Sequence, residues 1–149
     1  MTDPSIVLRE ADADDLDRVE ATLEANDLPH RDVRTSPGRF FLARSDGERV
    51  GVGGVEIRGS NGLLRSVVVE ESSRGRGYGA ALCEALEDYA RGNGAETLYL
   101  LTTTAPGFFR GRGYVEVDRE DVPSSVRATT EFADLCPASA TCMGKRLDG

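Results

Sequence analysis

The segment from Leu63 to Tyr89 constrains the fold of this 149-residue chain more than any other stretch. It begins with an apolar run that ends in three valines, passes through a glycine-rich turn at residues 74–79 and finishes in a helical pattern. A strand, a glycine-rich turn and a helix in this order form a cradle for phosphate. Glycine lets the backbone approach an anion closely, and the first N–H groups of a helix have no partners within the helix. We therefore predict an anion-binding loop, to which Arg74 and Arg76 add positive charge.

The spacing of the glycines excludes the two commonest nucleotide-binding loops. A P-loop ends in Gly-Lys-Ser or Gly-Lys-Thr, but the only lysine of the chain is Lys145. A dinucleotide-binding fingerprint needs Gly-x-Gly-x-x-Gly, whereas the glycines here are Gly75, Gly77 and Gly79. The loop instead has the pattern Arg-x-x-Gly-x-Gly, starting at Arg74.

This pattern, with three valines before it and Ala-Leu after it, resembles the acetyl-CoA loop of the GNAT family of N-acetyltransferases. The resemblance covers nearly the whole chain and implies one α/β domain over residues 1–149, with a mixed, mostly antiparallel sheet that opens at a V-shaped cleft flanked by helices. It also implies acetyl-CoA as co-substrate and a backbone N–H near Val69 that polarises the thioester carbonyl. The cofactor-binding residues that it implies are Val67, Val69, Arg74, Gly75, Arg76, Gly77, Tyr78, Gly79, Ala80, Thr102 and Phe109.

Composition and charge exclude several other classes of protein. The chain has 26 acidic and 18 basic residues, a net charge of −8, which argues against general nucleic-acid binding. No apolar run approaches 18 residues and the N-terminus lacks a signal-peptide pattern, so we expect a cytoplasmic protein without membrane spans. Three cysteines without a Cys-x-x-Cys pair indicate reduced thiols and no metal site. The acidic, arginine-rich composition fits either a GC-rich genome or a halophilic source.

Hydrophobic periodicity and turn residues predict a mixed sheet. An Asp-Gly turn joins two strands as a hairpin, and a helical crossover between two later strands makes that pair parallel. Glycines at 51, 53 and 54 weaken the second hairpin strand, so we expect a close backbone approach or a bulge there. The predicted strands are 6–9, 39–44, 49–58, 63–70, 96–101 and 138–147, and the predicted helices are 12–26, 80–89 and 122–135. A short helix within 102–114 should lead into a further strand.

The segment from Thr102 to Tyr114 resembles the GNAT pattern Asn-x-x-Ala-x-x-x-Tyr-x-x-x-Gly-Phe. Thr102 stands at the Asn position, and Phe109 stands where many members have a tyrosine that protonates the leaving CoA thiolate. A phenylalanine cannot donate a proton, so either another group acts as the acid or the thiolate leaves unassisted, which a thiol pKa of about 8.5 permits. This departure favours one alternative function, an acyl-CoA-binding module that lacks turnover.

Four charged residues are candidates for the acceptor site. Glu56 is either the solvent side of an alternating strand or a general base, acting directly or through water. Arg65 should share a face with Val67 by alternation, as a clamp for a substrate carboxylate or as a surface charge. Arg127 and Glu131, four residues apart on the predicted helix, either bind an amino acid's carboxylate and ammonium or form an exposed ion pair.

The C-terminal string Thr-Glu-Phe-x-x-Leu-Cys-Pro, from Thr130, resembles a GNAT subgroup identified as amino-acid N-acetyltransferases encoded in arsenic-resistance operons. The chain is also similar, more loosely, to the acetyltransferase domain of N-acetylglutamate synthases. These resemblances imply a small amino-acid-like amine as acceptor, with an arsenic-containing amino acid as one option, and they allow a homodimer. Cys136 is either a packing residue or an arsenic ligand, and His30 is either a loop residue or a group at the cleft.

Overall fold

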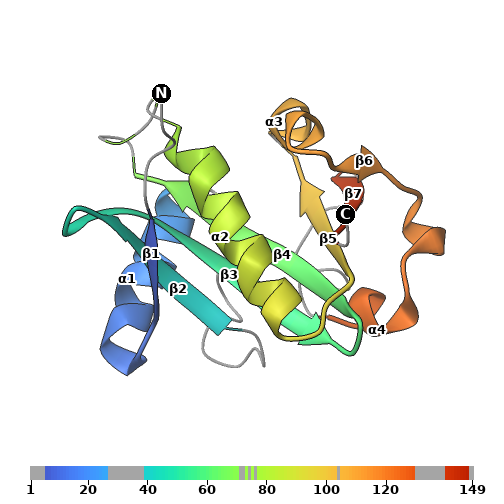
Figure 1. Cartoon of the computed structure of the whole chain (residues 1–149), viewed down its shortest axis with the longest axis horizontal. Helices are drawn as coiled ribbons and strands as arrows, with labels where there is room; N and C mark the ends of the chain where they lie inside the picture. The colour runs from blue at the N-terminus through green and yellow to red at the C-terminus, as the bar shows by residue number, and fades with distance from the viewer. Residues whose placement is uncertain are drawn as a thin grey trace.

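The computed structural model describes residues 6–26, 39–70, 73, 75, 77–103, 105–129 and 140–147. Within these residues the strands form one seven-stranded sheet in the order β1-β2-β3-β4-β5-β7-β6 (Figure 1). The strands are β1 (Val7–Glu10), β2 (Arg39–Ser45), β3 (Glu48–Arg58), β4 (Asn61–Val69), β5 (Thr97–Thr102), β6 (Val115–Glu116) and β7 (Thr141–Arg146). The helices are α1 (Ala13–Ala25), α2 (Tyr78–Gly92), α3 (Pro106–Gly111) and α4 (Ser124–Arg127), with a 3₁₀ turn at Arg119–Asp121.

Strands β4 and β5 form the parallel pair, and they separate soon after they meet. Their ladder joins Asn61–Leu63 of β4 to Thr97–Tyr99 of β5 and goes no further among the described residues. Beyond Leu63, β4 keeps only β3 as a ladder partner, while β5 continues against β7 (Figure 1). The other neighbouring pairs are antiparallel. The predicted mixed sheet that opens at its centre is therefore confirmed.

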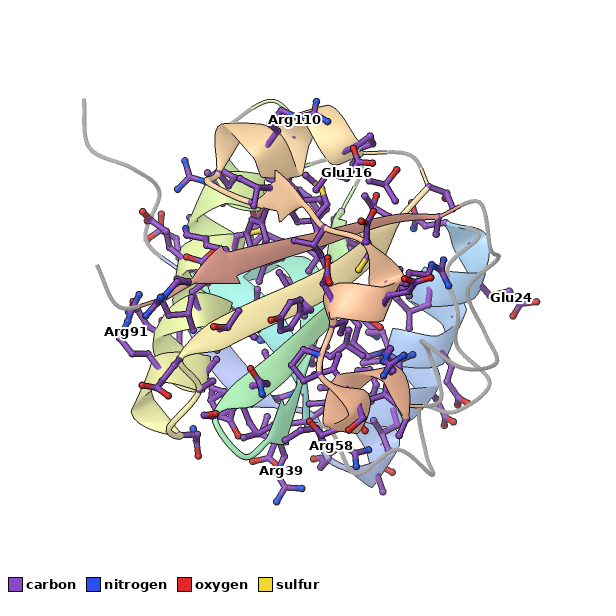
Figure 2. The ribbon with its side chains drawn as sticks, turned by 90° about the vertical axis from the view of Figure 1, so that its right-hand side faces the viewer. Glu24, Arg39, Arg58, Arg91, Arg110 and Glu116 are labelled. Atoms are coloured by element: carbon purple, nitrogen blue, oxygen red, sulfur yellow. The ribbon has the colours of Figure 1, made fainter. Side chains whose placement is uncertain are left out.

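Helices cover both faces of the sheet, α2 on one side and α1 with α4 on the other (Figure 2). On the first side, Leu82 and Leu86 of α2 pack in the main core with residues such as Phe41 and Leu64. On the second side, α1 covers a cluster that contains Phe40, Val52 and Val68. Helix α4 covers a third cluster, in which Val126 meets Leu63. The charged residues Glu24, Arg39, Arg91, Arg110 and Glu116 lie at the periphery (Figure 2).

Two glycines of β3 allow α2 to lie close to the sheet. A Cβ atom on Gly53 would be 2.5 Å from Cδ1 of Leu86, and one on Gly51 would be 2.4 Å from the carbonyl oxygen of Val68. Both distances are far below contact, so any larger residue would push α2 or β4 away. The expected close approach at these glycines is confirmed.

A bulge at Ser66 interrupts β4. Val68 pairs with Val52 and Arg65 pairs with Gly54, so β4 has one residue more than β3 between these two pairs. Ser66 has φ of +62°, a left-handed conformation that residues with a side chain rarely adopt. The extra residue reverses the alternation, because Val67 packs in the α2 core whereas Val68 joins the α1 cluster. The prediction that Arg65 shares a face with Val67 is therefore wrong.

Most element boundaries agree with the sequence within a few residues. Asp12 caps α1 in a reciprocal capping box with Asp15, as expected for an acidic helix start. The predicted helix over 122–135 is wrong in extent, since α4 ends at Arg127 and Thr129 bonds its hydroxyl to the carbonyl of Val126. Such a local bond competes with helix continuation. Strand β6 follows α3, where a strand is expected after the short helix, and the 3₁₀ turn has no counterpart among the predicted elements.

Candidate active site

A cavity of about 280 Å³ lies where β4 ends and α2 begins. Its lining residues are Val69, Ser73, Gly75, Gly77, Tyr78, Gly79, Ala80 and Phe108. Gly77 is the N-cap of α2 with φ of +83°, and Gly75 has φ of +81°, so both need the conformational freedom of glycine. The glycine-rich turn therefore shapes the floor of the cavity.

The start of α2 fits an anionic group such as the diphosphate of CoA. No side chain caps Gly77, and the first backbone bond of the helix runs from the N–H of Ala81 to the carbonyl of Gly77. The N–H groups of Tyr78, Gly79 and Ala80 therefore have no partner within the helix. They add to the positive end of the helix dipole, which favours phosphate oxygens.

The opposite wall of the cavity comes from α3. The ring of Phe108 is 41% exposed, and a Cβ atom on Gly79 would be 3.3 Å from it. Phe108 packs edge-to-face against Phe109, which packs in turn against Tyr114. Phe109 itself is only 9% exposed and belongs to the main core, so it supports Phe108 from behind and does not line the cavity.

A buried polar network anchors this aromatic row. The Tyr114 hydroxyl and the Lys145 ammonium donate to the two carboxylate oxygens of Glu87, at 3.1 and 3.0 Å. Lys145 also donates to the carbonyl of Arg112 at 2.8 Å. Burial and the Glu87 carboxylate raise the pKa of Tyr114, and burial raises the pKa of the nearby Cys83 thiol to about 12. The raised pKa values keep both groups protonated at neutral pH.

Arg65 and Ser66 lie on the other face of β4, the side of α1. Arg65 is 3% exposed, and its guanidinium carbon lies 5.2 Å from the centroid of the Phe40 ring. Its Nε–H donates to the Ser66 hydroxyl oxygen at 3.1 Å. Gly54 makes room for this arrangement, because a Cβ atom there would be 3.1 Å from Phe40 and 3.3 Å from Arg65. A cation held over a ring and by a hydrogen bond has a fixed orientation.

Glu56 is buried as well, at 3% exposure, which excludes the interpretation of a solvent-facing position. Arg58, two residues further on β3 and hence on the same face, donates from Nη2 to Glu56 Oε1 at 3.0 Å. The Nε–H of Arg58 is buried and finds no acceptor among the described residues. Glu56 pairs with Leu63, and Arg65 pairs with Gly54. The charged side chains of Arg58, Glu56 and Arg65 therefore follow one another along the β3–β4 ladder.

The structure brings together one part of the predicted site and leaves another part untested. Val69, Gly75, Gly77, Tyr78, Gly79 and Ala80 line one cavity. Thr102 lies outside it and accepts the Ala105 N–H at the start of α3. Val67 also lies outside the lining and contacts the main core. Arg127 is exposed at the end of α4. Arg74, Arg76, Glu131, Cys136 and His30 lie outside the described residues.

Sequence reasoning missed several residues that the structure brings to these two regions. They are Phe40, Arg58, Ser66, Ser73 and Phe108. A signal existed for Ser66, since it interrupts an otherwise apolar strand beside a charged residue. Alternation along the strand places Arg58 on the same face as Glu56, but it does not show that this face is covered.

Comparisons with known proteins agree with this arrangement. Residues 7–114 match the acetyltransferase (GNAT) family. The chain is 32% identical over 113 residues to an IAA acetyltransferase of Azospirillum brasilense, covering 69% of this chain and 74% of that protein. It is 38% identical over 71 residues to an amino-acid acetyltransferase of Pseudomonas paraeruginosa, covering 48% of this chain but only 16% of that protein.

Solved structures show the same fold. The N-acetylglutamate synthase of Neisseria gonorrhoeae, complexed with coenzyme A and N-acetyl-glutamate, superposes with a TM-score of 0.79 at 20% identity over 99% of this chain and 36% of that chain. A GNAT-family acetyltransferase of Staphylococcus aureus Mu50 gives a TM-score of 0.73 at 18% identity, covering 97% of this chain and the whole of that chain. None of the described helices is long and apolar enough to cross a membrane.

Proposed function

Because the chain belongs to the GNAT family of acetyltransferases, we propose that it transfers the acetyl group of acetyl-CoA to the amine of a small, amino-acid-like substrate. The observation that carries the acceptor class is the buried charge on the α1 side of the sheet. Arg65 and Glu56 are each 3% exposed. Arg65 lies in the part of β4 that has separated from β5, and Glu56 pairs with Leu63, the last β4 residue in the ladder with β5. An amino acid offers both a carboxylate and an ammonium, so a cation and an anion on this face of the sheet suit it as the acceptor.

The donor is proposed to enter from the α2 side. Its diphosphate would lie on the N–H groups of Tyr78, Gly79 and Ala80, with Arg74 and Arg76 adding charge. Its pantetheine would follow β4 along Val69 and Val67, with Thr102 and Phe109 on the β5 side of the cleft. The oxyanion of the tetrahedral intermediate would be bound by a backbone N–H near Val69. A donor of this kind contributes about 3–4 kcal/mol in enzymes where it has been measured.

Arg65 is proposed to bind the acceptor's carboxylate. The Phe40 ring and the Ser66 hydroxyl fix its guanidinium. An arginine in a fixed orientation can bind a carboxylate through two parallel hydrogen bonds. Since Val67 is two residues further along β4, the amine of the bound substrate would lie next to the thioester. Arg127 and Glu131 are retained as candidates for contacts with the rest of the substrate.

Glu56 is proposed as the general base, acting through water. It pairs with Leu63, which precedes Val67 by four residues. At about 3.3 Å per residue, this separation is roughly 13 Å along the strand, which is beyond the reach of a glutamate side chain. Water between the carboxylate and the substrate ammonium would carry the proton, and the bond from Arg58 would keep the carboxylate oriented.

The identity of the acceptor is proposed at the level of its class. The names of the Pseudomonas and Neisseria proteins support an amino acid. The likeness of Leu63–Ser66, of Leu101–Thr104 and of the C-terminal string to the arsenic-operon subgroup adds an organoarsenical amino acid to the acceptors that should be tested.

A thiol-release assay tests the proposal with pairs of acceptors that differ only in the carboxylate. Each amino acid is compared with its amide, for example glycine with glycinamide, and arsenical amino acids are included in the panel. We expect kcat/KM for the best amino acid to exceed that of its amide at least tenfold, and we expect Arg65→Gln to abolish this preference. Arg91→Gln is the matched control, because Arg91 lies at the far end of α2 and bonds to Asp88 and Leu147.

The alternative is an acyl-CoA-binding module without turnover, which Phe109 favours because it lacks the hydroxyl of the usual acid. Calorimetry with acetyl-CoA separates the two functions. Clear binding of acetyl-CoA together with no thiol release for any amine of the panel would establish the module and exclude the enzyme.

A further inference from the structure

Ser66 combines three features that are unusual for a strand residue. It is 8% exposed, it forms the bulge of β4, and its φ of +62° is in the left-handed region. Within the described strands it is the only residue with a side chain in that region, since Asp46 lies in the hairpin turn between β2 and β3. Six of the described glycines have positive φ, so glycine is the usual residue in this conformation. A serine in this conformation is strained relative to one in the usual strand conformation.

The hydroxyl of Ser66 keeps one lone pair and its proton free of hydrogen bonds to described residues. A hydroxyl has two lone pairs and one proton. The Nε–H of Arg65 uses one lone pair at 3.1 Å, and no described residue accepts the hydroxyl proton. The remaining lone pair and the O–H can therefore accept a proton from one atom and donate a proton to another. A proton relay needs these two functions.

The position of Ser66 suits such a relay. It precedes Val67 directly, in the part of β4 that no longer pairs with β5. Its hydroxyl lies with Arg65 on the side of the sheet where the acceptor is proposed to bind. Phe109 provides no hydroxyl, so the role of the usual tyrosine as proton donor to the thiolate is open to another group.

From these observations, and resting on the proposed acetyl transfer, we propose that the Ser66 hydroxyl relays a proton from the attacking nitrogen to the leaving sulfur. The neutral amine forms a bond to the carbonyl carbon, and the carbonyl π electrons move to oxygen. The hydroxyl oxygen of Ser66 then takes a proton from the positively charged nitrogen while its own proton passes to sulfur. The C–S bond breaks with its electrons on sulfur, the oxyanion re-forms the carbonyl, and the products are the N-acetyl compound and free CoA thiol. Ser66 ends unchanged.

Ser66→Ala and Ser66→Gly test the relay. Both remove the hydroxyl, and the glycine variant also removes the backbone strain, so at least one folded variant is expected. We expect kcat to fall about 100-fold, the lower end of general acid–base effects, while the Kd for acetyl-CoA measured by calorimetry stays within twofold. The same fall is expected with the amide acceptor. If Ser66 only held Arg65 in place, the loss would appear in KM for carboxylate-bearing acceptors and would vanish with the amide.

Phe109→Tyr supplies the second arm of the experiment. The tyrosine supplies a hydroxyl at the position where many GNAT proteins have their acid, so we expect it to raise kcat of Ser66→Ala at least tenfold. Retention of kcat within twofold in both Ser66 variants would overturn the relay while leaving the proposed function intact. Loss that appears only in KM, or loss without rescue by Phe109→Tyr, would also overturn it. A wild-type protein inactive with every amine would instead refute the proposed function, and the relay with it.

Discussion

Gly77→Val should remove the binding of acetyl-CoA and leave the fold intact. Gly77 has φ of +83° and ψ of 6° at the N-cap of α2. A left-handed conformation costs a residue with a side chain about 1–2 kcal/mol, which is small beside a typical stability of about 5–15 kcal/mol. For a domain of this size, we expect the midpoint of thermal unfolding to fall by about 2–8 °C.

The effect on binding should be much larger than this. Valine at position 77 would favour a negative φ, and the N–H groups of the first turn of α2 would then rotate away from the diphosphate. A hydrogen bond to a charged group contributes about 1.5–3 kcal/mol, so the loss of one bond raises the Kd roughly 10- to 150-fold. Losing two or three such bonds would remove measurable binding.

Gly94→Val is the matched control. Gly94 has φ of +94°, a Cβ atom there would meet nothing within 4 Å, and it follows the opposite end of α2. It should lower the midpoint of unfolding by a similar amount and leave the Kd for acetyl-CoA unchanged. Differential scanning fluorimetry and calorimetry measure the two quantities. Normal acetyl-CoA affinity in Gly77→Val, or equal losses of affinity in both variants, would refute the assignment of the loop.

Three further predictions concern buried polar groups. Glu56→Gln should lower kcat at least tenfold with little change in the Kd for acetyl-CoA, because it removes the proposed base and keeps the side-chain shape. An unchanged pH–rate profile would show that water, and not Glu56, acts as the base. Lys145→Met should lower the free energy of unfolding by about 3 kcal/mol in chemical denaturation, because Glu87 is left charged and buried. The double variant Lys145→Met with Glu87→Gln should recover part of the lost free energy. Burial raises the pKa of Cys83 to about 12, so about one such thiol in ten thousand is ionised at pH 8. Cys83 should therefore resist iodoacetamide until denaturant unfolds the chain. Rapid labelling of the folded protein would contradict its burial.

The fold could be predicted from the sequence because its strongest signals are local. The hairpin depends on Asp46-Gly47, the start of α1 on Asp12, and the parallel pair on the α2 crossover. Each signal lies within a few residues of the structure that it determines. The helix at α4 is different, since the periodicity continues past Arg127 but the hydroxyl of Thr129 bonds to the preceding turn.

The donor side of the site could be predicted for the same reason, and the acceptor side could not. The glycines at 75, 77 and 79 are close in sequence, so their spacing alone predicts the shape of the loop that lines the cavity. The acceptor side depends on which face of the sheet each residue occupies. A single inserted residue at Ser66 reverses that face for the rest of β4, and alternation counted along the sequence cannot detect it. The pairing of Arg58 with Glu56 follows from alternation along β3, but the burial of Glu56 depends on which face of the sheet the helices cover.

The early separation of β4 and β5 affects the tendency of the unliganded protein to aggregate. A strand that leaves its neighbour exposes backbone N–H and C=O groups along a free edge, and such edges recruit strands of other chains. Beyond Leu63, β4 forms no ladder with β5 in the described part of the chain. A ligand that occupies this opening would shield the edge, so we expect aggregation on mild heating to slow as acetyl-CoA is added, by more than its effect on the unfolding midpoint accounts for. The opening that admits the substrate would then also be the place where the unliganded chain is most prone to self-association.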